Sequence, residues 1–317
     1  MSKQIAAITS DIDSLESIYK GQGCYRAQGY THAEIRMGLE TFSRFLEPYR
    51  AKTTLFMVGN DFRYAENHDA IRAVAAEGHE IANHTMTHAQ GFRLLSAVEK
   101  EKELDGMEKA CEHVTGKRPV GFRSPGWNIG DDAIPILRRR GYLYDSSIHP
   151  TSIMPLLKLM HWSTMRERSA SDRTTMGHIK YMFAPTHPYR TSLRSFSERG
   201  RDGILEFPVT VTPILRLPFF ATFLVSTGLG LFQASLRELK RFKYPLQFQF
   251  HLSDFVDYSH SDLSDQVPQV GHGQYVPAAL NMTLDKKISL FKPAVDALAA
   301  DFEFITLEQW ASSTVQV

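Results

Sequence analysis

The stretch "EGHEIANHTMTH" (residues 77–88) decides the fold class of this chain. Gly78 ends an amphipathic helical pattern, a short apolar segment follows at 79–85, and His84 and His88 come at its end. A helix that leads into a buried strand is the repeat unit of parallel α/β folds, whose active sites form at the carboxyl ends of the strands. Two imidazoles there favour a metal site, because neutral imidazole is a common ligand of zinc-like ions.

The same unit recurs along the chain. It predicts an α/β fold in a single domain over residues 1–317, built as one distorted (β/α) barrel of TIM-like form with about seven strands. Residues from about 151 to 203 lack periodicity and are predicted to form an irregular loop region over the site. The expected strands are 5–11, 53–59, 79–85, 120–125, 142–147, 204–211, 244–252 and 302–307, and the expected helices are 32–47, 67–78, 97–115 and 131–141.

The composition excludes several classes of protein. With 36 basic and 35 acidic residues the formal charge is +1, so nothing points to a nucleic-acid partner. The first residues lack the pattern of a signal peptide, and Cys24 and Cys111 are too few for a disulfide scaffold, so we expect a cytoplasmic protein with free thiols. No G-x-G-x-x-G follows a strand, which leaves dinucleotide binding without support.

Polar side chains that can carry chemistry follow five of the expected strands. Because the carboxyl ends of parallel strands collect on one face, we expect these carboxylates, imidazoles and the guanidinium to converge at one mouth. Buried charge is costly unless it is paired or bound to a metal, so a structural core has little use for such a set. The residues are Asp11, Asp13, His84, His88, Arg123, Asp145 and His251.

Five short stretches around these residues resemble, in order, the five motifs of the polysaccharide deacetylase family, the NodB-homology carbohydrate esterases. The resemblance spans about residues 5–255 and implies a NodB-type distorted barrel that removes N- or O-acyl groups from sugars with one divalent metal. The stretches are "TSDIDS" (9–14), "HTMTH" (84–88), "RSPGW" (123–127), "YDSS" (144–147) and "FQFHL" (248–252).

The resemblance also implies the metal ligands and the base. Asp13, His84 and His88 would hold the metal, most simply zinc, although cobalt, nickel and iron suit the same ligands. Asp11 would be the general base, and Arg123 would pair with it and keep it ionised. The family commonly has two adjacent aspartates, whereas here one residue separates them, so which aspartate is base and which is ligand stays open.

The other implied roles concern the leaving group and the oxyanion. His251 would be the general acid, oriented by Asp145, and a backbone N–H near Gly126 or Trp127 would donate to the oxyanion. A plain turn at Asp145 is nearly as good an interpretation of that residue.

The predicted function is hydrolysis of the N-acetyl group of a small or lipid-linked sugar, in bacterial cell-envelope glycan or lipid-linked saccharide synthesis. The alternatives are a non-sugar amidohydrolase of the same fold, such as an allantoinase-like or cyclic imide-cleaving enzyme, and a catalytically silent glycan-binding barrel. The sequence does not fix the oligomeric state.

One nearly uncharged stretch, "LPFFATFLVSTGLGLF" (residues 217–232), is shorter than the roughly 20 apolar residues that span a bilayer. We expect an interior helix here. The alternative is a peripheral contact with the inner face of a membrane through this stretch.

Overall fold

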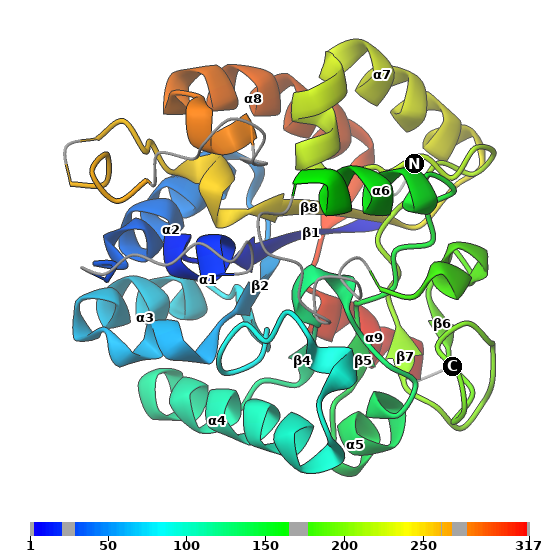
Figure 1. The fold of residues 1–317 in the computed structure, drawn as a ribbon. Coiled ribbons are helices and arrows are strands. Elements are labelled where there is room, and N and C mark those ends of the chain that lie inside the picture. Colours follow the sequence, from blue (N-terminus) through cyan, green and yellow to red (C-terminus); the bar gives the residue numbers. More distant parts are fainter. Residues whose placement is uncertain (1–2, 21–28, 165–176, 261, 268–277, 316–317) are drawn as a thin grey trace.

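The computed structural model describes residues 3–20, 29–164, 177–260, 262–267 and 278–315. Their strands form one sheet in the order β6-β7-β5-β4-β3-β2-β1-β8, with β9 paired to the start of β1. All pairs are parallel except β6 with β7, and helices surround the sheet (Figure 1). The strands are β1 (Gln4–Ile12), β2 (Thr53–Met57), β3 (Glu80–Asn83), β4 (Gly121–Phe122), β5 (Tyr144–Asp145), β6 (Tyr189–Arg190), β7 (Leu205–Glu206), β8 (Leu246–His251) and β9 (Phe302–Phe304).

The helices follow the strands as a parallel sheet requires, so the predicted distorted α/β barrel is confirmed. Among the described residues, no backbone ladder closes the sheet between β7 and β8, where instead the Gln247 backbone N–H donates to Thr210 Oγ1 at 2.8 Å. The division into a single domain stays a prediction. The helices are α1 (Leu15–Lys20), α2 (Ala33–Leu46), α3 (His68–Ala76), α4 (Ala97–Thr115), α5 (Ala133–Arg139), α6 (Met154–Thr164), α7 (Ala221–Arg241), α8 (Leu284–Asp301) and α9 (Leu307–Val315).

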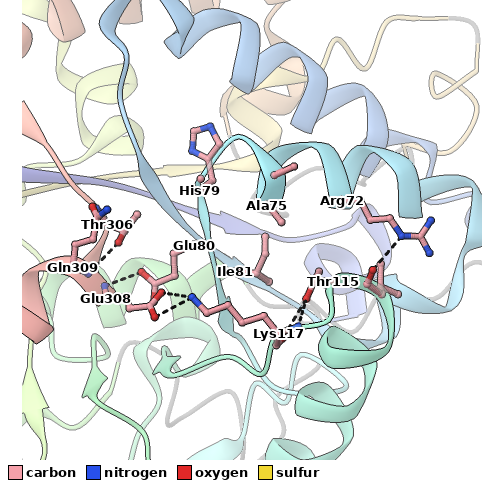
Figure 2. Close-up of a pocket in the computed structure, with 13 residues that line it drawn as sticks. Arg72, Ala75, His79, Glu80, Ile81, Thr115, Lys117, Thr306, Glu308 and Gln309 are labelled. Atoms are coloured by element: carbon pink, nitrogen blue, oxygen red, sulfur yellow. Dashed lines mark hydrogen bonds and ion pairs between the residues drawn. The ribbon is translucent and has the colours of Figure 1, made fainter.

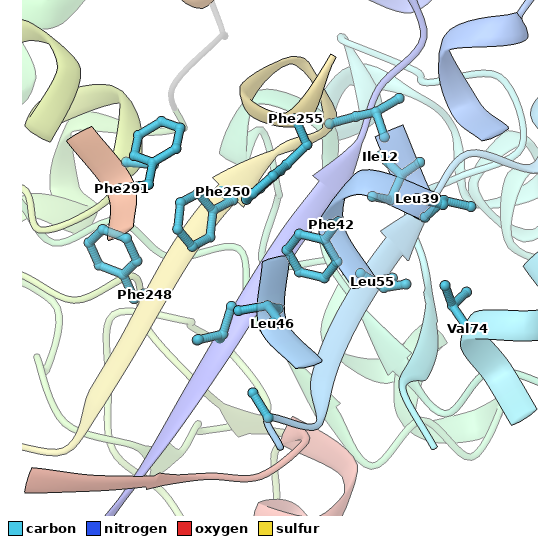
Figure 3. Close-up of a cluster of buried hydrophobic side chains, with 14 of the residues drawn as sticks. Ile12, Leu39, Phe42, Leu46, Leu55, Val74, Phe248, Phe250, Phe255 and Phe291 are labelled. Carbon is cyan, nitrogen blue, oxygen red and sulfur yellow. The ribbon is translucent and has the colours of Figure 1, made fainter. Parts of the chain in front are cut away.

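Alternation along β8 explains why its polar residues lie in the barrel. Phe248 and Phe250 point outward into the main hydrophobic cluster, where Phe250 contacts Phe42, Phe255 and Phe291 (Figure 3). Successive side chains of a strand point to opposite faces, so the residues between these phenylalanines face the interior. The strand therefore buries its apolar face under the helices and presents polar groups to the barrel.

The part of the barrel interior next to α9 is filled by apolar side chains. Phe56, Tyr144 and Phe207 pack together there, and Trp310 of α9 contacts Phe207 with ring centroids 5.2 Å apart. This packed layer supports the polar mouth above it, as expected for a barrel whose interior is a core.

The helix predicted at 97–115 is present as α4, with clear signals at both ends. Ser96 and Glu99 form a capping box at the start of α4, and Gly116 ends that helix with a φ of 73°. Both features satisfy backbone groups that a helix end leaves without partners.

The prediction of an irregular region over 151–203 is wrong in part. The segment contains helix α6 and strand β6, and residues 165–176 lie outside the described part. Pro155 stands at the second position of α6, where the missing N–H of proline costs nothing. The helix therefore begins within a stretch whose proline suggested a loop.

The stretch 217–232 is partly buried. Phe219, Leu224 and Phe232 are buried in the main cluster, and Phe219 stacks on Phe232 at 5.0 Å, as expected for the interior-helix interpretation. Gly228 interrupts α7 with a φ of 80°. Within the described residues, no helix is both long and apolar enough to cross a membrane.

Candidate metal centre and active site

Asp13, His84 and His88 meet at the mouth of the barrel, one from the end of β1 and two from the turn after β3. The Oδ1 atom of Asp13 lies 3.5 Å from His84 Nε2 and 3.2 Å from His88 Nε2, and one ligand atom of each residue lies within 4.8 Å of the others. Asp13 Oδ1 is buried without a hydrogen bond of good geometry. Two imidazoles and a carboxylate at these distances suit a divalent metal such as zinc.

The turn that carries both histidines is held tightly. Thr85 and His88 adopt left-handed backbone conformations, with φ of 68° and 54°, which non-glycine residues rarely do. The Thr85 N–H donates to Asn83 Oδ1 at 2.7 Å, and the Gly59 N–H donates to the Thr85 carbonyl at 2.9 Å. A Cβ at Gly59 would lie 3.0 Å from the backbone of Met86, so only glycine fits there.

Hydrogen bonding selects the ring nitrogen of His84 that faces the site. Its Nδ1 donates to the Arg123 carbonyl oxygen at 2.7 Å, which leaves Nε2 as the atom with a free lone pair. Burial lowers the pKa of His84 and so favours the neutral ring that a metal needs.

The charges of the surrounding histidines favour the ionised form of the Asp13 carboxyl group. Burial raises the pKa of Asp13, but the charges of His88, His84 and His251 outweigh this effect and hold the pKa below its ordinary value. Burial lowers the pKa of His88, but the nearby charge of Asp13 outweighs it and raises that pKa. A proton on His88 therefore competes with a metal for the same nitrogen.

Arg123 is fully buried and uses all five of its N–H groups. Its Nε donates to the Ser146 carbonyl oxygen and its Nη2 donates to Ser146 Oγ, both at 2.9 Å. The remaining bonds go to Asp11 Oδ1 at 2.6 Å, Thr9 Oγ1 at 3.3 Å and Gln247 Oε1 at 3.0 Å. The guanidinium also lies 4.0 Å from the centre of the Phe56 ring. Such complete pairing offsets the cost of burying the charge.

Asp11 is held from two sides. Its Oδ1 accepts from Arg123 and its Oδ2 accepts from Gln249 Nε2 at 2.8 Å. Each carboxylate oxygen has a second lone pair, so Asp11 can still accept a proton from water. The structure thus brings Asp13 to the histidines and Asp11 to the arginine, as the resemblance implied.

His251 stands beside Asp11, since the two residues are paired in register across β1 and β8. Its Nδ1 lies 3.3 Å from Thr222 Oγ1 of α7, and its backbone N–H donates to Asp254 Oδ2 at 2.9 Å. The described contacts therefore assign the orientation of the ring to Thr222, and Nε2 is left for proton transfer.

Asp145 does not have the surroundings that the sequence predicted. Tyr144 packs inside the barrel, so the next residue on the strand points to the outer face. There Asp145 accepts from Ser147 Oγ at 2.7 Å and lies in register with Glu206 of β7, whose carboxyl group hydrogen bonds to it. None of its described contacts is with His251, because strand alternation directs it away from the mouth.

The expected oxyanion donors are only partly available. The Trp127 N–H already donates to the Ser124 carbonyl oxygen at 3.1 Å, which leaves the N–H of Gly126 in the same turn as the candidate donor.

Several polar residues of the site were not predicted from the sequence. Gln247 and Gln249 hold Arg123 and Asp11, and Ser146 and Thr222 complete the network. The alternation of "LQFQFH" was a usable signal for both glutamines, because polar residues at every second position of a buried strand mark one shared face.

A separate cleft of about 480 Å³ lies at the opposite end of the barrel (Figure 2). It is lined in part by Glu80, Lys117 and Glu308. Glu80 is the first residue of β3, whereas the metal-centre histidines follow the last. Its carboxylate accepts from the Glu308 N–H of α9 at 2.9 Å and from Tyr144 Oη at 2.7 Å. These contacts make it a helix cap at the floor of the barrel.

Comparisons with known proteins agree with the motif resemblance. The family model described as polysaccharide deacetylase matches residues 36–144. A peptidoglycan deacetylase-like protein of Gibberella zeae is 40% identical over 77 residues, which cover 24% of this chain and 22% of that protein. A peptidoglycan-N-acetylglucosamine deacetylase of Bacillus cereus is 36% identical over 97 residues, which cover 31% and 44%. The chain thus spans less than half the length of these relatives.

Two solved structures share the fold over nearly the whole chain. A protein from Mycobacterium smegmatis described as a polysaccharide deacetylase has a TM-score of 0.58 at 19% identity, over 99% of this chain and 91% of that one. The Puue allantoinase has a TM-score of 0.57 at 12% identity, over 98% and 90%. At these identities the likeness concerns the fold alone.

Proposed function

We propose that this chain, whose residues 36–144 match the family model described as polysaccharide deacetylase, is a metal-dependent hydrolase that removes acetate from an N-acetylated sugar. The Asp13–His84–His88 triangle carries the proposal, because its buried, unpartnered carboxylate oxygen faces two imidazole nitrogens. Zinc suits this donor set, and cobalt, nickel or iron(II) are compatible with it. When bound, the metal would polarise the amide carbonyl and acidify a water molecule.

The residues around the triangle supply the proton transfers. Asp11 takes a proton from the attacking water, and its bonds from Arg123 and Gln249 fix the direction in which the carboxylate points. The Gly126 N–H would donate to the negative charge that develops on the carbonyl oxygen.

The leaving amine needs a proton, because an amide anion is a very poor leaving group. His251 supplies it from Nε2 while Thr222 holds Nδ1. Asp11 and His251 side by side on adjacent strands therefore provide a base and an acid for the two halves of one hydrolysis.

We extend the proposal to bacterial cell-envelope glycan synthesis, with support from the name of the Bacillus cereus relative. A lipid carrier on the substrate, a location at the inner membrane face and the cytoplasmic location stay predictions.

The test is a product assay on purified, zinc-loaded protein. Acetate should appear from N-acetylglucosamine oligomers, and Asp13→Ala should abolish its release while His113→Ala, on helix α4, should leave it unchanged. Ammonia or carbamoyl products from ureides, without acetate from sugars, would support the allantoinase-like alternative. Zinc binding without turnover of either panel would support the silent barrel.

A further inference from the structure

His149 lies beside Trp127 in a position that the proposed chemistry does not use. We infer that the His149 ring and the Trp127 indole form a subsite that binds a hydroxyl group of a neutral sugar ring next to the catalytic centre. The inference rests on the proposed function, because it names the part of the substrate that this site recognises.

Three unpartnered polar atoms mark the subsite. Both ring nitrogens of His149 and the Nε1 atom of Trp127 are buried and have no hydrogen-bond partner, and His149 is only 1% exposed. Buried polar groups in proteins are almost always hydrogen-bonded, so three unpaired nitrogen atoms on two neighbouring rings indicate that a ligand supplies the missing hydrogen bonds. The ring centroids of these residues are 4.6 Å apart.

The subsite lies between two segments that touch the catalytic centre. Trp127 follows Gly126, whose N–H is the candidate oxyanion donor. Phe220, whose ring is 5.5 Å from His149 and 5.7 Å from Trp127, directly precedes helix α7, and Thr222 of that helix holds His251. A group bound at His149 would therefore lie beside the reacting amide.

The chemistry of the site favours a hydroxyl. Burial lowers the pKa of His149 to about 3, so the ring is neutral at physiological pH and offers one donor and one acceptor. The Trp127 N–H adds a second donor. A hydroxyl both donates and accepts, whereas a carboxylate or phosphate needs a cation, and burial alone, with no charged neighbour, shifts the pKa of His149.

The aromatic rings favour a sugar as the bearer of that hydroxyl. Trp127 and Phe220 present apolar faces that suit the C–H face of a pyranose, while the nitrogens meet its polar edge. Trp127 has a φ of 54°, a left-handed conformation rare for a non-glycine residue, and its side chain remains partly exposed. Because the His149 ring is buried beside the indole, sugar binding requires the indole to turn aside.

The test compares His149→Phe, which keeps a ring and removes both nitrogens, with the parent protein. We expect kcat/KM for N,N′-diacetylchitobiose to fall about tenfold, which corresponds to about 1.4 kcal/mol, while kcat/KM for 4-nitroacetanilide, which has no hydroxyl, stays within about twofold. Because the variant removes orphaned polar atoms, its Tm should rise.

A matched control is His187→Phe. This ring also packs on an aromatic residue, Tyr244 at 4.2 Å, but at the end of β8 away from His251, so both substrates should behave as in the parent. Equal losses on both substrates in His149→Phe, as expected if a structural water fills the site, would overturn the inference.

Binding without turnover separates this inference from the proposed function. Titration calorimetry of the metal-free protein with N-acetylglucosamine should give a Kd about tenfold weaker for His149→Phe, and also for Trp127→Phe should the first variant fail to fold. An unchanged affinity for N-acetylglucosamine in a folded variant would contradict the subsite, even if the parent protein deacetylates sugars. If the parent protein binds the sugar through its hydroxyl group but hydrolyses no amide, the proposed function is contradicted and the subsite is supported.

Discussion

The Asp11 carboxylate lies 2.6 Å from the Arg123 guanidinium, although the two residues are 112 positions apart in the chain. Both side chains are buried, so water cannot take the place of either partner in this ion pair. The pair joins β1 to the end of β4 through the interior of the barrel, so it fixes both the proposed base and the segment whose carbonyl orients His84.

Arg123→Met should lower the free energy of unfolding by about 3–5 kcal/mol, because it leaves a buried carboxylate without its cation. Urea denaturation measures the effect. In the double variant with Asp11→Asn the loss should be clearly smaller than the sum of the two single losses. Strict additivity would mean that the pair is not coupled in the folded protein.

Metal removal should abolish activity and lower the Tm. Zinc at 1,000 times its Kd should stabilise the folded state by about 4 kcal/mol. His88→Ala should bind less than one equivalent of zinc by elemental analysis, and zinc affinity of the parent should fall as the pH drops through the raised pKa of His88. Full zinc occupancy in His88→Ala would remove this residue from the ligand set.

His251→Gln should lower kcat by about 10²–10⁴-fold with little change in KM, as expected for loss of a general acid. Thr222→Val should have a smaller effect, because it frees the ring without removing it. If His251→Gln keeps the kcat of the parent, the proposed role of this residue is excluded.

His32 should make stability depend on pH. Its Nδ1 lies 2.9 Å from Asp61 Oδ1 and its Nε2 lies 3.0 Å from Glu16 Oε2. Burial lowers the pKa of His32, but Asp61, Glu34 and Glu16 outweigh burial and raise it above its ordinary value. A folded-state pKa above the unfolded one stabilises the protein fully below about pH 6.5, and this stabilisation is lost as the pH rises through the folded pKa.

The measurement is the difference in unfolding free energy between the parent and His32→Gln. It should shrink as the pH rises from 5.5 to 9. A difference that stays constant or grows over this range would show that the ring is not charged in the folded protein.

Glu206 should be protonated in the folded protein. Burial raises its pKa, and the charge of Asp145 raises it further. Glu206→Gln keeps a donor toward Asp145 and cannot ionise, so at pH 8 it should raise the free energy of unfolding, whereas the two proteins should match near pH 4. Denaturation at both pH values measures this. Lower stability of the variant at pH 8 would contradict a shared proton.

Much of the site could be predicted from the sequence because its residues stand at strand ends. Apolar segments located β1, β3 and β8, and the polar residues that follow or end them meet at one mouth in any parallel barrel. The two-residue strands β4, β5 and β7 are different, since nothing local fixes which face their residues present. That is why Asp145 was expected at the mouth and lies on the outer face.

The sequence by itself determined the alternation of strands and helices and the set of residue types that can hold a metal, because both depend on periodicity and on positions close in the chain. Only the tertiary structure decided which partners each buried group has. The five bonds of Arg123, the Asp145–Glu206 pair and the burial of His149 between two aromatic rings all join residues distant in sequence. Such pairing follows from strand register and helix packing, which no local pattern encodes.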